Sequence, residues 1–174
     1  MRVRLEVPVT TDDHALGSLD AEFVLVQYGD YECPYTRRSL REVEVVRDEL
    51  GDALRWVFRN FPLSEIHPHA LRAAEAAEAA GAQGRFWEMH ALLFAHQKAL
   101  ENEDLRRYAV EAGLDADAFA AEMAAGLHLD RIRADFDGGV RSGVGGTPTF
   151  FVNGLRHDGP YDGPVLLAAL GSTS

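Results

Sequence analysis

A strand, a helix and a second strand follow one another between residues 23 and 59, and this order most constrains the fold. Phe23 to Tyr28 is an apolar run that is typical of a buried strand. From Pro34 to Leu50, apolar residues recur at helical spacing, which predicts a helix that ends at Gly51. Residues 53–59 alternate in polarity and predict a second strand. Two strands joined by a helix favour parallel pairing with a right-handed crossover, so we expect an α/β fold.

The middle of the chain, residues 67–136, contains no convincing strand pattern. We expect successive helices there, beginning near Ala70, Phe86, Asn102 or Asp104, Asp115 and His128. A helical stretch of this length between strand-rich segments predicts an inserted helical subdomain. Near the N-terminus, residues 3–7 are a possible edge strand and residues 10–20 form a polar stretch.

Strand character returns near the C-terminus, at residues 149–152. Asn153-Gly154 follows, and this dipeptide is the strongest short signal for a hairpin turn. Residues 155–157 are then expected to form the return strand, and residues 162–170 a last helix. The C-terminal part therefore predicts a β-hairpin followed by a helix.

Cys33 is the only cysteine of the chain, and it lies between the first predicted strand and the helix that begins at Pro34. Unpaired N–H groups and the helix dipole at such a position favour a thiolate. Cysteines in this setting commonly have a pKa lowered from about 8.5 into the range of roughly 3.5 to 7.5. The charged neighbours Asp30 and Glu32 are expected to be solvated, and Cys33 to be partly exposed. A dithiol redox centre would have its second cysteine at position 36, where this chain has Thr36.

A second feature is the stretch Gly145-Gly146-Thr147-Pro148-Thr149, which precedes a predicted strand. A proline at this point cannot donate a hydrogen bond to a sheet. If the Thr147–Pro148 bond is cis, at a cost of only about 0.5–1 kcal/mol, the backbone of Thr147 turns outward. An extended peptide could then pair with that backbone as an added strand.

Charge and composition exclude several classes of function. The net charge of −11, from 17 basic and 28 acidic residues, argues against a nucleic-acid or anionic-membrane partner. No run approaches the length of a membrane span and no signal-peptide pattern is seen, so cytoplasmic localisation is expected. A single cysteine excludes an internal disulfide and a cysteine-rich zinc site. The histidine pairs 67/69 and 90/96 lack ligand spacing, so we expect no metal and no bound cofactor.

The two motifs together resemble the DsbA-like branch of the thioredoxin family. They are Cys33-Pro34-Tyr35-Thr36 at the start of a helix and Gly-Thr-Pro-Thr-Phe-Phe-Val-Asn-Gly at residues 146–154. The resemblance runs from about residue 14 to residue 170 and includes residues 61–63, 67–70 and 83–87.

This resemblance implies one DsbA-like domain over residues 1–174. It would have a thioredoxin-like core sheet of four or five strands, flanked by helices, at about residues 14–63 and 140–172. An all-helical insertion would occupy about residues 64–139. The resemblance also implies that Cys33 is the nucleophile and that Pro148 is a cis-proline facing it. We expect Pro34, Tyr35 and Thr147 to contact substrate together with Pro148.

The chain departs from the family pattern at two positions. Thr36 stands where the resolving cysteine would be, and Gln27 stands where many members carry a buried acid. Because a buried carboxylate without a thiol to deprotonate only costs desolvation energy, the two changes make chemical sense together. They predict a monothiol site, in which Cys33 attacks a disulfide and Thr36 could donate its hydroxyl to the thiolate.

The leading hypothesis is thus a monothiol thiol–disulfide oxidoreductase or isomerase that exchanges with protein or small-molecule thiols and disulfides. An external thiol, such as glutathione or another low-molecular-weight thiol, must resolve the mixed disulfide. The first alternative is a redox-silent peptide-binding module of the same fold. The second is a glutathione-using transferase or isomerase of kappa type, although those enzymes generally carry serine where this chain has Cys33. The sequence makes no prediction of an oligomeric state.

Overall fold

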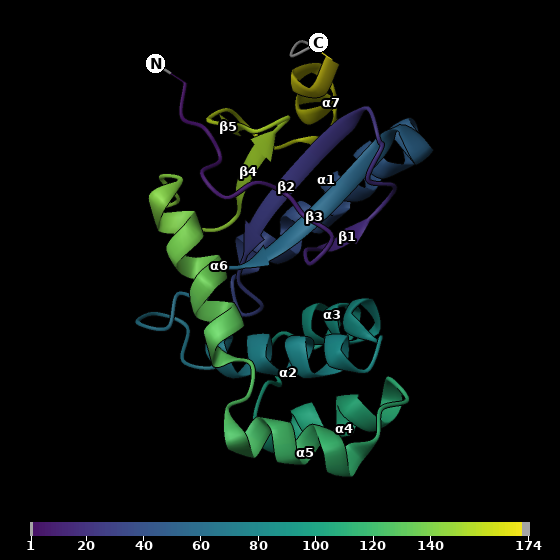
Figure 1. Cartoon of the computed structure of the whole chain (residues 1–174), viewed down its shortest axis with the longest axis vertical. Helices are drawn as coiled ribbons and strands as arrows, with labels where there is room; N and C mark the ends of the chain where they lie inside the picture. The colour runs from purple at the N-terminus through teal and green to yellow at the C-terminus, as the bar shows by residue number, and fades with distance from the viewer. Residues whose placement is uncertain (1, 172–174) are drawn as a thin grey trace. The chain divides into compact units, whose positions relative to one another are not determined.

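The computed structural model describes residues 2–171, and these form two compact units. The described parts of residues 1–29, 35–61 and 136–174 make up the first, which we call the sheet unit. Residues 30–34 and 62–135 make up the second, the helical unit. Figure 1 labels the elements of both units, and the predicted α/β class is confirmed.

The sheet unit contains a five-stranded sheet with the order β1-β3-β2-β4-β5 within the described residues. The two central strands, β2 (Phe23–Gly29) and β3 (Leu54–Asn60), pair in parallel, as the strand–helix–strand pattern predicts. The other pairs are antiparallel and involve β1 (His14–Leu16), β4 (Thr149–Val152) and β5 (Leu155–His157). The turn between β4 and β5 is the predicted Asn153-Gly154, where both residues have positive φ angles of 47° and 81°.

Helices flank this sheet. The helix α1 (Pro34–Leu50) has the predicted bounds and lies behind β2 and β3 in Figure 1. Its buried side chains recur every three or four residues, at Thr36, Ser39, Val43 and Val46. A 3₁₀ turn at Gly51–Ala53 leads from α1 into β3. The last helix, α7 (Gly163–Gly171), contacts β2 and β4, and its first N–H donates to Glu42 of α1 at 2.7 Å.

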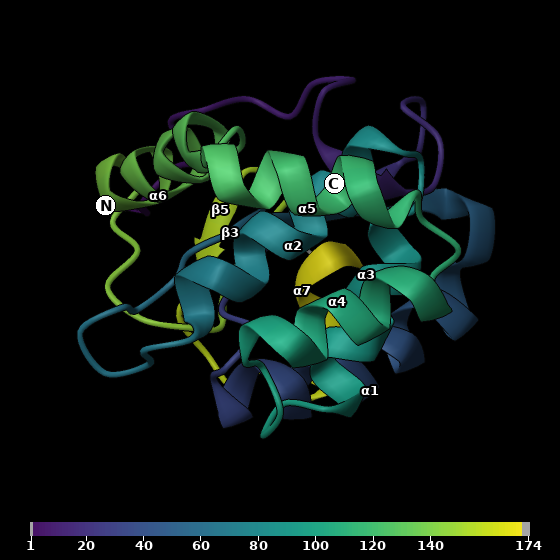
Figure 2. The same cartoon turned by 90° about the horizontal axis from the view of Figure 1, so that it is seen from below.

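The helical unit is built around α2 (Ala70–Ala82), which contacts α3 (Phe86–Ala95), α4 (Asn102–Glu111) and α5 (Ala116–Ala125). Figure 2 shows these helices from below. Most alanines of α2 are fully buried, and their small side chains allow neighbouring helices to approach closely. The helix α6 (Leu129–Arg141) continues from this unit into the sheet unit, where its Phe136 stacks on Phe61 with ring centroids 4.3 Å apart.

The N-terminal segment differs from the prediction. Residues 3–7 do not form a strand; they make only an isolated bridge, between Arg4 and Leu155. The carbonyl groups of Val7 and Pro8 instead accept hydrogen bonds from the side chain of Arg59, at 2.8 and 3.0 Å. Proline also lacks the N–H that a strand ladder requires. The edge strand is β1, which falls inside the stretch that the sequence marks only as polar.

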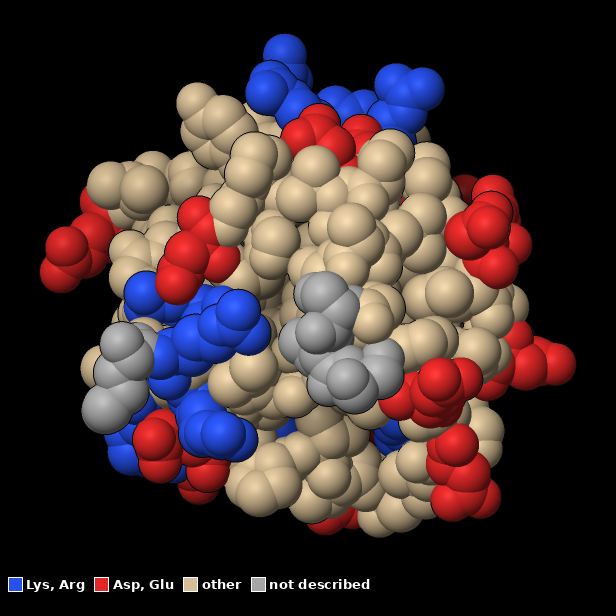
Figure 3. Space-filling view, turned by 90° about the horizontal axis from the view of Figure 1, so that it is seen from above, with Lys and Arg blue, Asp and Glu red and all other residues tan. Residues whose placement is uncertain are grey.

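Charge is distributed unevenly over the surface. In Figure 3, basic side chains gather in places while acidic ones are spread around the rest of the face. The N-terminal segment pairs with β5 through the Arg4–Leu155 bridge and an Arg156 N–Val3 O hydrogen bond, so Arg4 and Arg156 lie at the same edge of the sheet. Arg156 also forms an ion pair with Asp158 at 2.6 Å. The net charge of −11 gives no indication that these two arginines, which are distant in sequence, lie close together.

No helix within residues 2–171 is both long enough and apolar enough to cross a membrane.

Candidate functional site

Cys33 ends a tight turn that joins β2 to α1. Its N–H donates to the carbonyl of Asp30 at 3.1 Å, and Pro34 then opens the helix. We call residues 30–33 the Cys33 turn. The side chain of Cys33 is only 3% exposed, so the predicted partial exposure is wrong. The turn belongs to the helical unit, in which Gln97 bonds to its backbone and residues 63–69 bond to its acidic side chains.

Asp30 anchors the start of this turn. It is 1% exposed, so the expectation of a solvated carboxylate is also wrong. One carboxylate oxygen accepts the N–H of Glu32 at 2.7 Å, and the other accepts the N–H of Leu63 at 2.9 Å. The second oxygen also lies 2.8 Å from Nδ1 of His67. These partners compensate the burial of the acid and tie the turn to residues 63–67.

Glu32 is held by His69. The carboxylate of Glu32 accepts the N–H of His69 at 2.7 Å and lies 2.9 Å from its Nδ1. The other ring nitrogen of His69 lies 2.9 Å from Glu101. These contacts, the hydrogen bond to Glu32 first and that to Glu101 second, raise the pKa of His69 above its ordinary value. His69 therefore bridges the turn and the start of α4.

The second residue of the Cys33 turn is a buried tyrosine. Tyr31 is 1% exposed, packs beside Phe94, and has its hydroxyl 3.0 Å from Nδ1 of His90. Burial, followed by the negative charges of Glu78 and Asp135, raises the pKa of Tyr31 well above its ordinary value. Tyr31 is therefore a neutral packing residue near physiological pH.

The side chain of Gln97 completes the frame of the turn. Its Nε2 donates to the carbonyl oxygens of Tyr31 and Cys33, at 3.0 and 2.8 Å. The sequence does not predict the role of Gln97. It also does not predict the contacts of Asp30 with His67 and of Glu32 with His69. The histidines are visible there only as candidate metal ligands, and nothing in the pattern around Gln97 indicates its role.

Gln27 lies in the sheet unit, and it is fully buried. Its Nε2 donates to Ser39 Oγ at 2.8 Å, and its Oε1 accepts from Trp56 Nε1 at 3.2 Å. The hydroxyl of Ser39 in turn donates to the carbonyl of Thr36 at 2.7 Å. This chain places a neutral amide where the family resemblance implies a buried acid, and an amide cannot exchange a proton with a thiol near neutral pH.

The Thr147–Pro148 peptide bond is cis. Pro148 lines a cavity of about 220 Å³ in the sheet unit, together with Gly145 and the polar residues Arg156 and His157. Polar side chains therefore line the cavity next to the proline.

The predicted site residues divide between the two units. Cys33 and Pro34 belong to the helical unit. The sheet unit contains Tyr35, Thr36, Thr147 and Pro148. Thr36 is fully buried, whereas the ring of Tyr35 is exposed and lies under the guanidinium of Arg38 at 5.5 Å.

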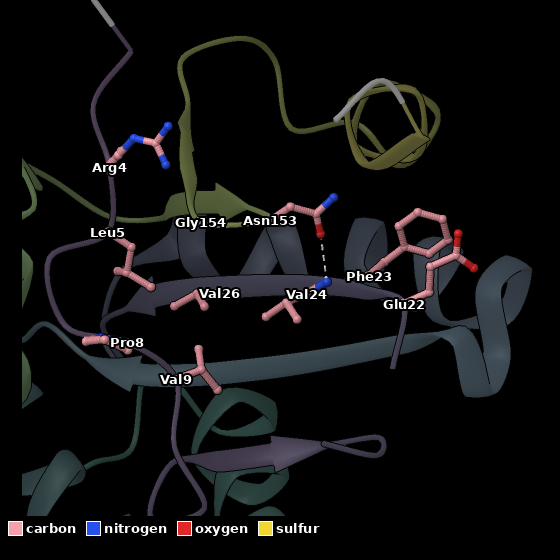
Figure 4. A pocket seen from close by; sticks show the side chains of 10 residues that line it. All are labelled: Arg4, Leu5, Pro8, Val9, Glu22, Phe23, Val24, Val26, Asn153 and Gly154. Atoms are coloured by element: carbon pink, nitrogen blue, oxygen red, sulfur yellow. Dashed lines mark hydrogen bonds between the residues drawn. The ribbon is translucent and has the colours of Figure 1, made fainter. Parts of the chain in front are cut away.

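A larger pocket, of about 580 Å³, lies under the N-terminal segment of the sheet unit (Figure 4). The side chains of Leu5 and Val9 face those of Val24 and Val26 across it, and Asn153 closes one side by accepting the N–H of Val24 at 2.9 Å. None of the predicted site residues lines this pocket. Within residues 2–171, no three His, Cys, Asp or Glu side chains gather as metal ligands.

Comparison with known proteins identifies the family. A family model described as Thioredoxin matches residues 9–170. The solved structure of a thioredoxin-like oxidoreductase from Silicibacter pomeroyi is 27% identical and has a TM-score of 0.83, with 94% of this chain and 93% of that chain covered. BdbD from Bacillus subtilis has a TM-score of 0.79 at 19% identity, with 98% and 100% covered. The thiol–disulfide exchange protein alpha-DsbA2 from Wolbachia pipientis has a TM-score of 0.78 at 19% identity, with 94% and 88% covered.

Curated relatives carry a different name. The chain is 48% identical over 171 residues to the Na⁺/H⁺ antiporter NhaA 3 of Salinispora tropica, with 97% of this chain covered. It is 45% identical over 173 residues to NhaA 1 of Mycolicibacterium vanbaalenii, again with 97% covered. The chain spans only 26% and 28% of the length of these two relatives. The likeness therefore concerns about a quarter of each antiporter.

The fold and the family match both support chemistry of the thiol–disulfide oxidoreductase type, and the predicted resemblance to DsbA-like proteins is confirmed. Since the family model covers nearly all of the sequence, the chain belongs to the thioredoxin family, with the fold of its DsbA-like members.

Proposed function

We propose that the protein catalyses monothiol exchange through Cys33. The thiolate sulfur of Cys33 attacks one sulfur of a mixed disulfide between a protein and glutathione, forming a new S–S bond and releasing the protein thiolate. A second thiol, here glutathione, then attacks the Cys33 adduct, restores the Cys33 thiolate and leaves as glutathione disulfide. Overall, the protein sulfur of the mixed disulfide is reduced to a thiol and the sulfur of the incoming glutathione is oxidised, and the two glutathiones leave joined by one disulfide, so electrons balance without any further oxidant.

The position of a single cysteine supports this proposal. Cys33 directly precedes α1, where helix N–H groups favour a negative charge. Thr36 occupies the place of a resolving cysteine, and no other cysteine exists in the sequence. Net oxidation of a dithiol by this chain alone is therefore barred, whereas isomerisation and deglutathionylation need only one sulfur.

The buried amide of Gln27 supports the same assignment. A dithiol enzyme gains from a buried acid that takes the proton of its second thiol. Here Gln27 is fully engaged by Ser39 and Trp56, and it has no acidic proton to transfer. Because a reducing compartment would supply the resolving thiol, we propose that the exchange takes place in the cytoplasm.

The test is to trap the intermediate. The full chain is incubated with glutathione disulfide, and intact mass spectrometry should show one glutathionyl group on Cys33 that added glutathione removes. Cys33→Ser should show no adduct and no release of glutathione from a glutathionylated protein substrate. If wild-type protein and Cys33→Ser deglutathionylate that substrate at the same rate, the proposal is wrong.

One observation favours a second candidate, the redox-silent binding module. Cys33 is only 3% exposed, so a disulfide must gain access to a largely covered sulfur. A module of this kind would bind peptides beside Pro148 while Cys33 stays inert. Absence of any adduct, combined with peptide binding that Cys33→Ser leaves unchanged, would select this candidate.

The antiporter names of the relatives describe proteins of which this chain matches about a quarter. We draw the proposed chemistry from the thioredoxin family match.

A further inference from the structure

We infer that Gln97 is a positioning residue for the sulfur of Cys33, an inference that rests on the proposed exchange function. Gln97 lies in the segment between α3 and α4, more than sixty positions along the chain from the Cys33 turn. It is nevertheless the side chain that holds the backbone carbonyl of the nucleophile itself, at 2.8 Å.

The geometry uses both hydrogens of one amide nitrogen. The Nε2 group of a glutamine carries two N–H bonds that diverge in the amide plane. In this protein Nε2 lies 3.0 Å from the carbonyl oxygen of Tyr31 and 2.8 Å from that of Cys33. Both distances are in the normal range for N–H···O hydrogen bonds. Gln97 therefore spans the turn from its second residue to its last.

These bonds restrain Cys33 from both sides. Its N–H is held by the carbonyl of Asp30 at 3.1 Å, and its C=O is held by Gln97. The directions of the backbone N and C atoms determine where Cβ projects, because the four bonds of Cα are tetrahedral. With both ends held, the sulfur can move only by rotation about the Cα–Cβ bond.

Such restraint matters for exchange, because a thiolate must approach a disulfide along the S–S axis. Misplacement of a reacting atom by about 1 Å can lower a rate by up to about a hundredfold. The other anchors of the turn act at a greater distance from the sulfur. Asp30 and Glu32 hold it at its first and third residues through residues 63–69, whereas Gln97 bonds to the carbonyl of Cys33 itself.

The experiment replaces the donor with side chains of similar size. Gln97→Met keeps the length but has no donor, and Gln97→Glu keeps the shape but presents acceptors to two carbonyl oxygens. Gln83→Met is the matched control, since Gln83 lies in the same unit and also bonds to backbone through its amide, accepting the N–H of Asp115 at 2.8 Å and donating to the carbonyl of Asp115 at 3.3 Å. We expect Gln97→Met to slow adduct formation with glutathione disulfide by about ten- to a hundredfold, and Gln97→Glu to slow it further. Gln83→Met should keep the wild-type rate.

A second measurement separates positioning from a loss of stability and from failure of the proposed function. Carbonyl ¹³C shifts of Tyr31 and Cys33 report their hydrogen bonds without any exchange reaction, and they should change in Gln97→Met but not in Gln83→Met. If Gln97→Met does not fold, Gln97→Asn, which is shorter by one methylene but equally polar, makes the same test. Unchanged carbonyl shifts overturn the inference even where wild-type Cys33 forms no adduct. Where wild-type Cys33 does form the adduct, the inference is overturned by either of two results. One is a wild-type rate of adduct formation in the Gln97 variants, and the other is a rate in Gln83→Met that falls as much as in Gln97→Met.

Discussion

Loss of one partner of the buried ion pair between Arg59 and Asp13 is expected to destabilise the sheet unit strongly. Arg59 donates from Nε and Nη2 to the two carboxylate oxygens of Asp13, at 2.8 and 3.0 Å, and the two side chains are only 4% and 7% exposed. Arg59 also donates to the carbonyls of Val7 and Pro8 and to the hydroxyl of Tyr28. Burial lowers the pKa of Arg59, but the hydrogen bonds to Asp13 and Tyr28 outweigh it and raise the pKa above its ordinary value. The guanidinium is therefore charged at every working pH.

The cost of breaking this pair follows from its burial. Arg59→Met keeps the aliphatic stem but removes the guanidinium that pairs with the buried carboxylate of Asp13. Removing one partner of a buried pair typically costs about 3–5 kcal/mol. Asp13→Asn leaves the guanidinium with three other acceptors, so the expected cost is about 1.5–3 kcal/mol, that of hydrogen bonds to a charged group. In the double variant the second change should cost less than it does alone, by about 1 kcal/mol or more.

Urea unfolding followed by circular dichroism measures these differences. With a slope of about 2 kcal/mol per molar urea, a loss of about 4 kcal/mol lowers the midpoint by about 2 M. Arg47→Met is the control, because the Arg47–Glu44 pair is exposed, at 35% and 56%, and such pairs contribute about 0–1 kcal/mol. The reasoning is refuted if Arg59→Met costs no more than Arg47→Met, or if the two single changes are additive to within about 0.5 kcal/mol.

Three further outcomes are expected. Thr36→Cys should form an internal disulfide with Cys33 and give dithiol oxidase turnover; a wild-type protein that already matches this variant in a dithiol assay contradicts the monothiol mechanism. Hydrogen bonds to its two glutamate partners raise the pKa of His69 above 6.5, so their stabilising effect is complete below that pH and is lost as the pH rises through the folded-state value. Thermal unfolding should therefore show an advantage of wild type over His69→Gln that shrinks with rising pH, and a constant difference would refute this account. Gly29→Ala would place a Cβ 2.5 Å from the ring of Phe58, so it should cost about 1–3 kcal/mol in urea unfolding, and a neutral effect would mean that the ring can move aside.

Much of the fold could be predicted because its signals are local. The bounds of α1 follow from a proline that suits the first helical turn and a glycine that ends the helix, with apolar residues at helical spacing between them. The hairpin of β4 and β5 follows from Asn153-Gly154, since few other residues adopt the positive φ angles that this turn requires. The single cysteine at the start of a helix is equally local, and it identifies the proposed nucleophile without any knowledge of packing.

What only the tertiary structure decided involves residues that are distant in the chain. The strand β1 has only three residues, and it forms because it can pair with the edge of β3. The carbonyl of Val7, earlier in the chain, instead accepts a hydrogen bond from Arg59. The contacts that hold the buried residues Cys33 and Asp30 come from residues 63–97, none of which carries a local signal of that role. A hydrogen bond such as that from Gln97 to Cys33 forms only after the intervening helices have packed. Its energy is small beside the entropy of closing such a loop, so the turn pattern by itself cannot predict its partner. The sequence by itself therefore determines that Cys33 is the one thiol and which elements carry it, and long-range packing decides how that thiol is held and covered, because the side chains that do so come from distant parts of the chain.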